Sequence, residues 1–365
     1  MKKSALFFTS LFLCFSLFAQ SSDARKLTNE EAPWRILEQA QVAFDSGNYG
    51  NALNLSNKAK ENRALEIHYE VNVLETALAP RQVRKAGEHF SDVLLVLSER
   101  DENEAISLIN RYVERYGEAF YADSVTRLTE WLKASIVYPE ADFLIGRVYQ
   151  LEGEYALASS FYEKARTEAD FLDIPDVKYT ILYAMADLAL QQGKQEDYEQ
   201  MLLLILDTDK NYQNKALLRS FGKIVDADTA ENASRFFSLF RCETKHAIPA
   251  LYQLCRLSEK RNDDEAVFTC AALGMLEAFT HILEALQERD TDFHFTTLSS
   301  FFDAVAAYPE FLAWAEDNHV WELFFIFADS AQKRGATVFS SCLYTIMSES
   351  LPTEYWRKQA TKRLR

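Results

Sequence analysis

The chain has 365 residues, and its 10 Gly and 7 Pro make up about 5 % of it, against ~12 % in average usage. So few turn residues exclude turn-rich β-sandwiches, barrels and propellers, and 48 % hydrophobic with 26 % charged residues excludes a disordered or fibrous chain. The net charge of −16 repels phosphate backbones at long range, so we expect no nucleic-acid partner. The composition predicts an all-α globular protein.

The first 19 residues follow the three-part plan of a secretory signal peptide. Met1–Lys3 is basic, and Ala5–Ala19 is an uncharged apolar run that ends in a small residue, where we expect cleavage. A run of ~15 residues is short for a membrane-spanning helix, which needs ~20, and no later segment is expected to span. The sequence therefore predicts an exported protein of the periplasm or cell envelope, with a linker over residues 20–30.

Two alternatives stay open at this end of the chain. The signal could remain uncleaved as an anchor, or Cys14 could be the acylated first residue of a lipoprotein, although Leu11-Phe12-Leu13 places a bulky Leu where a lipobox has a small residue. Otherwise Cys14 is one apolar residue of the signal. We expect membrane association only if Cys14 is lipidated or the signal is uncleaved.

The clearest repeat unit begins after Pro139. Small and aromatic residues recur there at the spacing of a helix, a tight glycine turn and a second antiparallel helix: Gly146, Tyr149, Gly153, Tyr155, Ala158, Tyr162 and Ala165. Gly146 and Ala158 would let the two helices approach closely, and Gly153 would supply the turn. The unit resembles the tetratricopeptide repeat, whose small and aromatic positions these seven residues fill in order.

Two weaker units keep the same frame. One opens at Pro33 and turns at Gly47, and the other turns at Gly193. Gly193 follows Gly153 by 40 residues, which is longer than one repeat of ~34 residues, so residues 171–175 are expected to be an insertion. Residues 65–135 are expected to form helical hairpins without a turn glycine. We interpret residues 31–210 as tetratricopeptide-like repeats of an α-solenoid, similar to exported bacterial envelope proteins. Residues 211–365 are predicted to be α-helical, with degenerate repeats as one interpretation.

The resemblance implies a concave surface that is lined by the first helix of each pair and binds a protein or peptide partner. The candidate groove residues are Trp34, Gln41, Phe44, Phe143, Arg147, Gln150, Tyr183 and Asp187. Arg147 among aromatic side chains could clamp a carboxylate or stack on a ring. For Phe44 and Phe143, packing against an adjacent helix is the open alternative.

The C-terminal third is rich in aromatic residues, with ten Phe and Trp residues from Phe293 to Phe327. We predict an aromatic interior, and the alternative is an exposed pocket of a solute- or glycan-binding envelope protein. At the end of the chain, five basic residues are expected to complement the negative end of the last helix: Arg357, Lys358, Lys362, Arg363 and Arg365.

The four cysteines after the signal are predicted to be buried thiols. Cys242, Cys255, Cys270 and Cys342 lie in apolar helical sequence and form no C-x-x-C pair, and one disulfide among the first three is the alternative. The sequence contains none of the nucleotide-binding, hydrolase, zinc-protease or EF-hand motifs. We therefore expect no catalytic, metal or cofactor-binding residues and no enzyme, with a peptidoglycan-acting enzyme as the least favoured alternative.

Overall fold

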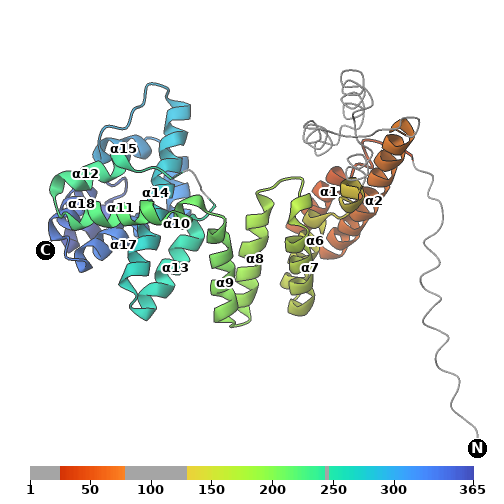
Figure 1. Ribbon diagram of the computed structural model, residues 1–365, viewed down its shortest axis with the longest axis horizontal. Helices are drawn as coiled ribbons and strands as arrows, with labels where there is room; N and C mark the ends of the chain where they lie inside the picture. Colours follow the sequence, from red (N-terminus) through yellow and green to blue (C-terminus); the bar gives the residue numbers. More distant parts are fainter. Residues whose placement is uncertain (1–24, 79–129, 243–245) are drawn as a thin grey trace, which may run out of the picture. The chain divides into compact units, whose positions relative to one another are not determined.

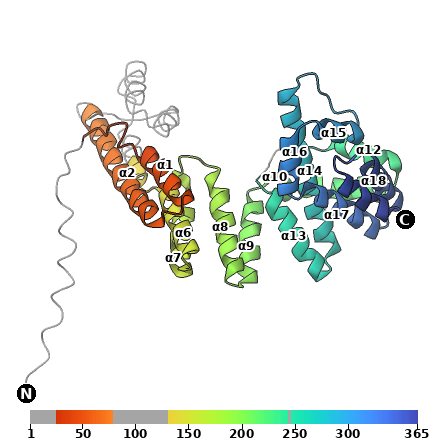
Figure 2. The same ribbon diagram turned by 180° about the vertical axis from the view of Figure 1, so that it is seen from behind.

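The computed structural model describes residues 25–78, 130–242 and 246–365. Within these ranges the backbone forms helices, turns and loops and no strand, which confirms the all-α prediction for this part of the chain (Figures 1 and 2). The predicted signal and Cys14 lie outside the described residues. The chain divides into two compact units, Met1–Ile181 and Leu182–Arg365.

The described residues of unit 1 form four long helices and a short 3-10 helix: α1 (Pro33–Asp45), α2 (Tyr49–Leu78), α6 (Pro139–Leu151), α7 (Tyr155–Thr167) and η2 (Ala169–Phe171). Pro33 and Pro139 occupy the first turns of α1 and α6, where the missing N–H of proline has no cost. Helix α8 (Val177–Gln191) spans the division between the units.

Unit 2 continues with eleven further helices. They are α9 (Gln195–Asp207), α10 (Lys210–Gln213), α11 (Lys215–Asp226), α12 (Ala230–Leu239), α13 (Ile248–Arg261), α14 (Asp264–Arg289), α15 (Leu298–Ala306), α16 (Pro309–Asp317), α17 (Val320–Lys333), α18 (Thr337–Ser350) and α19 (Glu354–Arg363).

Five pairs of consecutive helices are joined by the same turn. One residue in the left-handed conformation follows the first helix, at φ between +56° and +93°: Gly47, Gly153, Gly193, Asn262 and Gly335. The next residue donates its N–H to the carbonyl five residues earlier, at 2.8–3.0 Å in every case. This is the Schellman arrangement, which satisfies the last carbonyls of a helix and favours residues that tolerate positive φ. The predicted turns at Gly47, Gly153 and Gly193 are therefore confirmed.

The five pairs also bury the same positions relative to this turn. The residue seven places before it is small and buried: Ala40, Gly146, Ala186, Cys255 and Ala328. The residues five, nine and twelve places after it are buried in all five pairs; in the second pair these are Ala158, Tyr162 and Ala165. The hairpins α13–α14 and α17–α18 thus share the register of the N-terminal pairs.

Unit 1 stacks its two hairpins through α2 and α6. Ala40, Ala43 and Phe44 of α1 pack in one apolar cluster with Ala52 of α2 and Leu144 of α6. Residues 65–78 continue α2 without a break, so the hairpin expected to begin at 65 does not begin there, and the remainder of that prediction up to 129 lies outside the described residues. The expected insertion is present, because η2 and a non-helical segment separate α7 from α8.

Six of the ten Phe and Trp residues between Phe293 and Phe327 are buried in the interior of unit 2, whereas Phe293, Phe295, Phe311 and Trp314 are half-buried. Phe301, Phe302, Trp321, Phe324 and Phe327 are all buried. Their rings contact one another and neighbouring rings at centroid distances of 4.7–6.4 Å, and such pairs contribute ~0.5–1.5 kcal/mol each beyond burial. These side chains are therefore core, and they do not line an exposed pocket.

Helix α14 corrects one expectation from the sequence. With 26 residues it is long and apolar enough to cross a membrane by length and composition, although we expected no such segment after the signal. Of its most apolar stretch, 83 % is buried against protein, as in the central helix of a packed core.

All four cysteines are free thiols, and Cys242, Cys255 and Cys270 are buried as predicted, whereas Cys342 is half-buried. Burial raises the pKa of the Cys270 thiol to about 12, and the pKa values of Cys242 and Cys255 are raised for the same reason. We refer to Cys242, Cys255 and Cys270 below as the three buried thiols.

Candidate functional site

Helix α1 presents side chains on both sides of its buried face. Successive helix residues are rotated by ~100°, so Ile36, Ala40 and Ala43 lie in the core of unit 1 while Trp34 and Val42 point outward. Trp34 is 53 % exposed and Val42 is 64 % exposed. Large apolar side chains exposed on one helix are candidates for contact with a partner.

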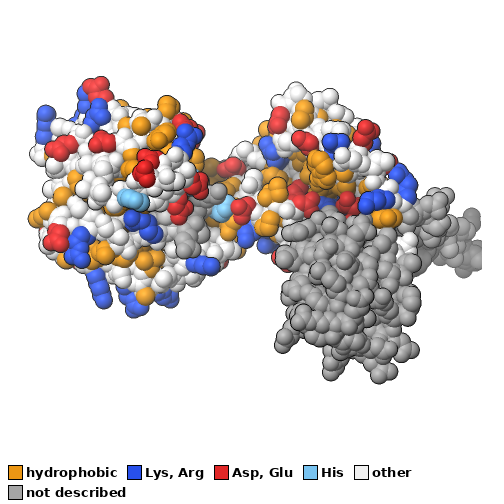
Figure 3. Space-filling view, turned by 90° about the horizontal axis from the view of Figure 1, so that it is seen from above, with side chains coloured by type: hydrophobic (Ala, Val, Ile, Leu, Met, Phe, Trp, Pro, Cys, Tyr) orange, Lys and Arg blue, Asp and Glu red, His pale blue; other side chains and the backbone are white. Residues whose placement is uncertain are grey.

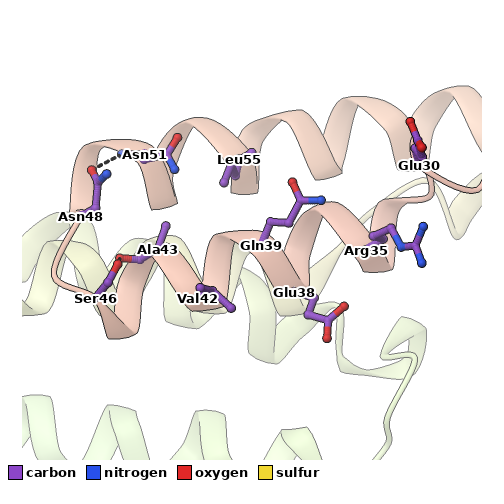
Figure 4. A pocket seen from close by; sticks show the side chains of 10 residues that line it. All are labelled: Glu30, Arg35, Glu38, Gln39, Val42, Ala43, Ser46, Asn48, Asn51 and Leu55. Carbon is purple, nitrogen blue, oxygen red and sulfur yellow. Dashed lines mark hydrogen bonds between the residues drawn. The ribbon is translucent and has the colours of Figure 1, made fainter.

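An open groove of about 850 Å³ follows α1 and α2 on one side of this helix. Its lining combines apolar, amide and charged side chains: Glu30, Arg35, Glu38, Gln39, Val42, Ala43, Ser46, Asn48, Asn51 and Leu55 (Figure 4). Asn48 caps the start of α2 by accepting the N–H of Asn51 at 3.3 Å, and Gln39 lies between the two helices (Figure 4). Amides both donate and accept hydrogen bonds, so this lining suits a polypeptide of mixed polarity.

On the other side of α1, Arg147 of α6 lies over the ring of Phe44. Its guanidinium carbon is 4.2 Å from the Phe44 ring centroid and 5.9 Å from that of Phe143. Its Nη1 donates to Gln41 Oε1 at 3.3 Å, and Gln41 Nε2 donates to Asp45 Oδ1 at 2.7 Å. Among the residues that the structure describes, no carboxylate forms an ion pair with Arg147. The half-buried guanidinium therefore keeps hydrogen-bond donors for an acceptor supplied from outside.

Tyr162 of α7 holds Gln150 and Phe143 of α6 in place. The Tyr162 hydroxyl donates to Gln150 Oε1 at 2.5 Å, and the rings of Tyr162 and Phe143 lie 5.6 Å apart. Tyr162 is fully buried, so the aromatic positions of the hairpin hold the two α6 side chains in place.

A buried ionic cluster fixes α6 against its neighbours. Asp142 is fully buried and pairs with Lys60 of α2 at 2.5 Å and with Lys164 of α7 at 2.9 Å. A lone buried carboxylate would be costly, whereas two lysine partners from flanking helices compensate its charge. The cluster ties α2, α6 and α7 together and so positions Arg147.

A second charged group anchors the insertion after α7. Arg63 of α2, only 1 % exposed, lies over the Tyr138 ring and pairs with Asp173. Glu140 Oε1 accepts the backbone N–H of Asp173 at 2.6 Å. Burial, with the nearby Asp173 charge, raises the pKa of Glu140.

The eight predicted groove residues are divided between the two units. Six lie in unit 1, where Gln41, Phe44, Phe143, Arg147 and Gln150 come together and Trp34 stands exposed at the start of α1. Phe44 and Phe143 are buried, so for these two the open alternative of packing against a neighbouring helix is what the structure shows.

The two groove residues of unit 2 differ from each other. The Tyr183 hydroxyl donates to the carbonyl of His246 at 2.6 Å and accepts the N–H of Ala250 at 3.1 Å. Tyr183 therefore fastens α8 to the start of α13 and is not a free groove side chain. Asp187 is exposed on α8.

Sequence reasoning missed the α1–α2 groove. Its residues Arg35, Gln39 and Val42 lie on the side of α1 away from α6, whereas the tetratricopeptide resemblance directs attention to the concave side. The signal that could have revealed it is Val42, an apolar residue whose neighbours one helical turn away, such as Glu38 and Ser46, are polar.

Comparison with known proteins leaves the family open. No family model and no solved structure matches the chain. The chain is similar to an uncharacterized protein of Treponema pallidum (strain Nichols), with 28 % identity over 338 residues, 91 % of this chain and 90 % of that protein.

In the described part of the chain, no three His, Cys, Asp or Glu side chains gather as a metal site requires.

Proposed function

We propose that the protein is an exported, tetratricopeptide-like helical-repeat scaffold that binds a protein partner in the periplasm or cell envelope. The observation that carries the proposal is the hairpin that recurs five times with one turn geometry and one buried register. Hairpins that share a register stack into solenoids, whose extended surfaces serve as binding sites. Export rests on the signal-like first 19 residues of the sequence.

The surface of α1 supplies the partner site in this proposal. Trp34 and Val42 offer exposed apolar area, and the groove offers amides and charges of both signs. Arg147 offers a cation with further hydrogen-bond donors. Exposed aromatic and Arg side chains are the residue types that most often dominate binding energy. A peptide or helix that places apolar residues on Trp34 and Val42 and polar side chains along the groove fits this arrangement, whereas Arg147, on the other side of α1, offers a separate contact. The proposal includes no cofactor and no nucleic acid.

Site-specific photo-crosslinking tests the proposal. Benzoylphenylalanine is incorporated at position 34, 42 or, as the control, 157, and the cells that express the protein are irradiated. Leu157 is a suitable control because it is 45 % exposed on α7 of the same unit. We expect a discrete adduct of higher mass from positions 34 and 42, identified by mass spectrometry as one protein, and none from 157.

A second substitution separates binding from random collision. Val42→Asp leaves the core untouched, because the side chain is mostly exposed, and it should abolish the adduct from position 34. Equal crosslinking from 34 and 157, or a position-34 adduct that survives Val42→Asp, would refute α1 as the partner site.

A further inference from the structure

The last helix, α19, has two faces with different chemistry. Its inner face is fixed to α16, α17 and α18: Ala360 is fully buried, Trp356 Nε1 donates to Glu316 Oε1 at 2.8 Å, and Arg363 donates to the Asp329 carboxylate at 3.1 Å. The Arg363 guanidinium also lies 4.8 Å from the Phe325 ring centroid. These contacts hold the helix in one orientation on unit 2.

The outer face carries a stripe of cations with one aromatic ring. Tyr355, Lys358 and Lys362 follow one another at the helical spacing that places them on the same side, and Arg365 follows just after the helix ends at Arg363. Tyr355 is 62 % exposed, and Leu364 next to the row is also exposed. We call Tyr355, Lys358, Lys362 and Arg365 the α19 stripe.

The cations of the stripe differ from those of the inner face in their partners. Arg357 donates to the Leu351 carbonyl at 2.7 Å, and Arg363 pairs with Asp329. Lys358 pairs only with Glu354, one helical turn away and equally exposed, and Lys362 and Arg365 form no ion pair with any residue that the structure describes. Complementing the helix dipole accounts for cations in the last turn, but not for a row of them along the exposed side.

We infer that the α19 stripe is a docking surface for an anionic phospholipid membrane. Such docking needs neither a lipidated Cys14 nor an uncleaved signal, contrary to the expectation from the sequence. Lys and Arg beside an exposed Tyr and Leu are the side chains that lie well at a membrane interface, where the charges meet headgroups and the apolar parts enter the boundary. Tyr355, Lys358 and Lys362 project from one helix face and exposed Arg365 lies just beyond its end, so a flat anionic surface can contact all of them.

Charge over the rest of the protein does not prevent this contact. The net charge is −16, and on the face that Figure 3 shows, acidic and basic side chains are interspersed. At physiological ionic strength, charges farther away than ~8 Å are largely screened, so the local stripe decides the interaction. This docking surface is independent of the proposed partner site on α1, which lies in the other unit.

Vesicle sedimentation tests the inference. The chain from Gln20 onward keeps every described residue and lacks the apolar N-terminal run, which would bind lipid by itself. It is mixed with vesicles of phosphatidylcholine alone or with 30–40 % phosphatidylglycerol (about one lipid in three, so that the surface potential is strongly negative). We expect partitioning into the anionic vesicles only, and weaker partitioning as salt is raised.

Two triple variants with the same net charge distinguish the stripe from charge in general. Lys358→Gln with Lys362→Gln and Arg365→Gln should lower the partition constant ~100-fold, about fivefold per cation. The control, Lys194→Gln with Lys215→Gln and Lys260→Gln, removes three exposed lysines elsewhere in unit 2 and should leave partitioning unchanged. Circular dichroism checks that both variants keep the helical fold, and Tyr355→Ala should weaken partitioning severalfold in a variant with unchanged charge.

Three results would overturn the inference. They are equal partitioning into vesicles without phosphatidylglycerol, an equal loss in both triple variants, and tighter binding to soluble polyglutamate than to anionic vesicles. The last result would assign the stripe to an acidic protein.

Discussion

Gly146 in α6 lies directly against side chains of α7 in the second hairpin. A Cβ at this position would lie 2.6 Å from Cδ1 and Cε1 of the Tyr162 ring and 3.3 Å from Cβ of Phe161. Tyr162 is fully buried and its hydroxyl is held by Gln150, so its ring cannot swing into solvent. Overpacking of this kind costs ~1–3 kcal/mol, while Ala gains ~0.5–1 kcal/mol over Gly in a helix. Gly146→Ala should therefore destabilise unit 1 by about 1–2 kcal/mol.

Native-state hydrogen exchange measures this effect where it occurs. The amides of α6 and α7 should exchange ~5–30-fold faster in the variant, the factor that corresponds to such a loss. Gly50→Ala is the matched control, because Gly50 is helical and its Cβ would meet nothing within 4 Å; it should be neutral or stabilising by up to ~1 kcal/mol. Unchanged or slower exchange in Gly146→Ala would refute the close-approach reasoning.

Three further predictions concern the turns, a buried acid and the thiols. Gly335→Ala should cost ~1 kcal/mol, because φ is +93° and L-residues are strained there, whereas Asn262→Gly should be neutral or stabilising; urea midpoints that move in the same direction for both would contradict the shared turn. Burial and the charge of Asp173 raise the folded pKa of Glu140. The free energy of unfolding should therefore fall as the pH rises from ~4.3, the pKa of an unfolded Glu, through the folded pKa. Glu140→Gln should remove this loss, so identical pH slopes of the urea midpoint in variant and parent would exclude it. In the native chain from Gln20 onward, a thiol reagent should modify half-buried Cys342 first and the three buried thiols only on unfolding, and mass mapping that finds a buried thiol modified first would contradict this.

The turns show how far the sequence predicts the fold. Gly47, Gly153 and Gly193 could be recognised because each is followed by residues of the repeat pattern. Asn262 was missed as a turn centre because a left-handed Asn carries no more signal than any polar residue in a loop. Gly335 was missed because the small residues Ala328 and Ala331 directly follow the aromatic run of α17, and the repeat pattern is hard to recognise there.

The candidate site shows where sequence reasoning ends. Helical spacing placed Arg147 among aromatic side chains, and the structure brings it onto Phe44. Spacing within a helix cannot say which side a neighbouring hairpin covers, so Phe44 and Phe143 could not be separated from exposed Trp34. The pairing of Arg63 with Asp173, 110 residues apart, depends on stacking of hairpins that no local pattern encodes.

The small buried residue seven places before each turn has a consequence for how such a chain can diverge. Ala, Gly and Cys all serve at this position, so the space between the helices constrains side-chain volume and leaves residue identity free. Substitutions that preserve volume at a few spaced positions can therefore accumulate while every hairpin persists. A relative with 28 % identity over almost the whole chain is compatible with one architecture, and a saturation-mutagenesis profile should show five narrow minima at these positions, each tolerant of small side chains alone.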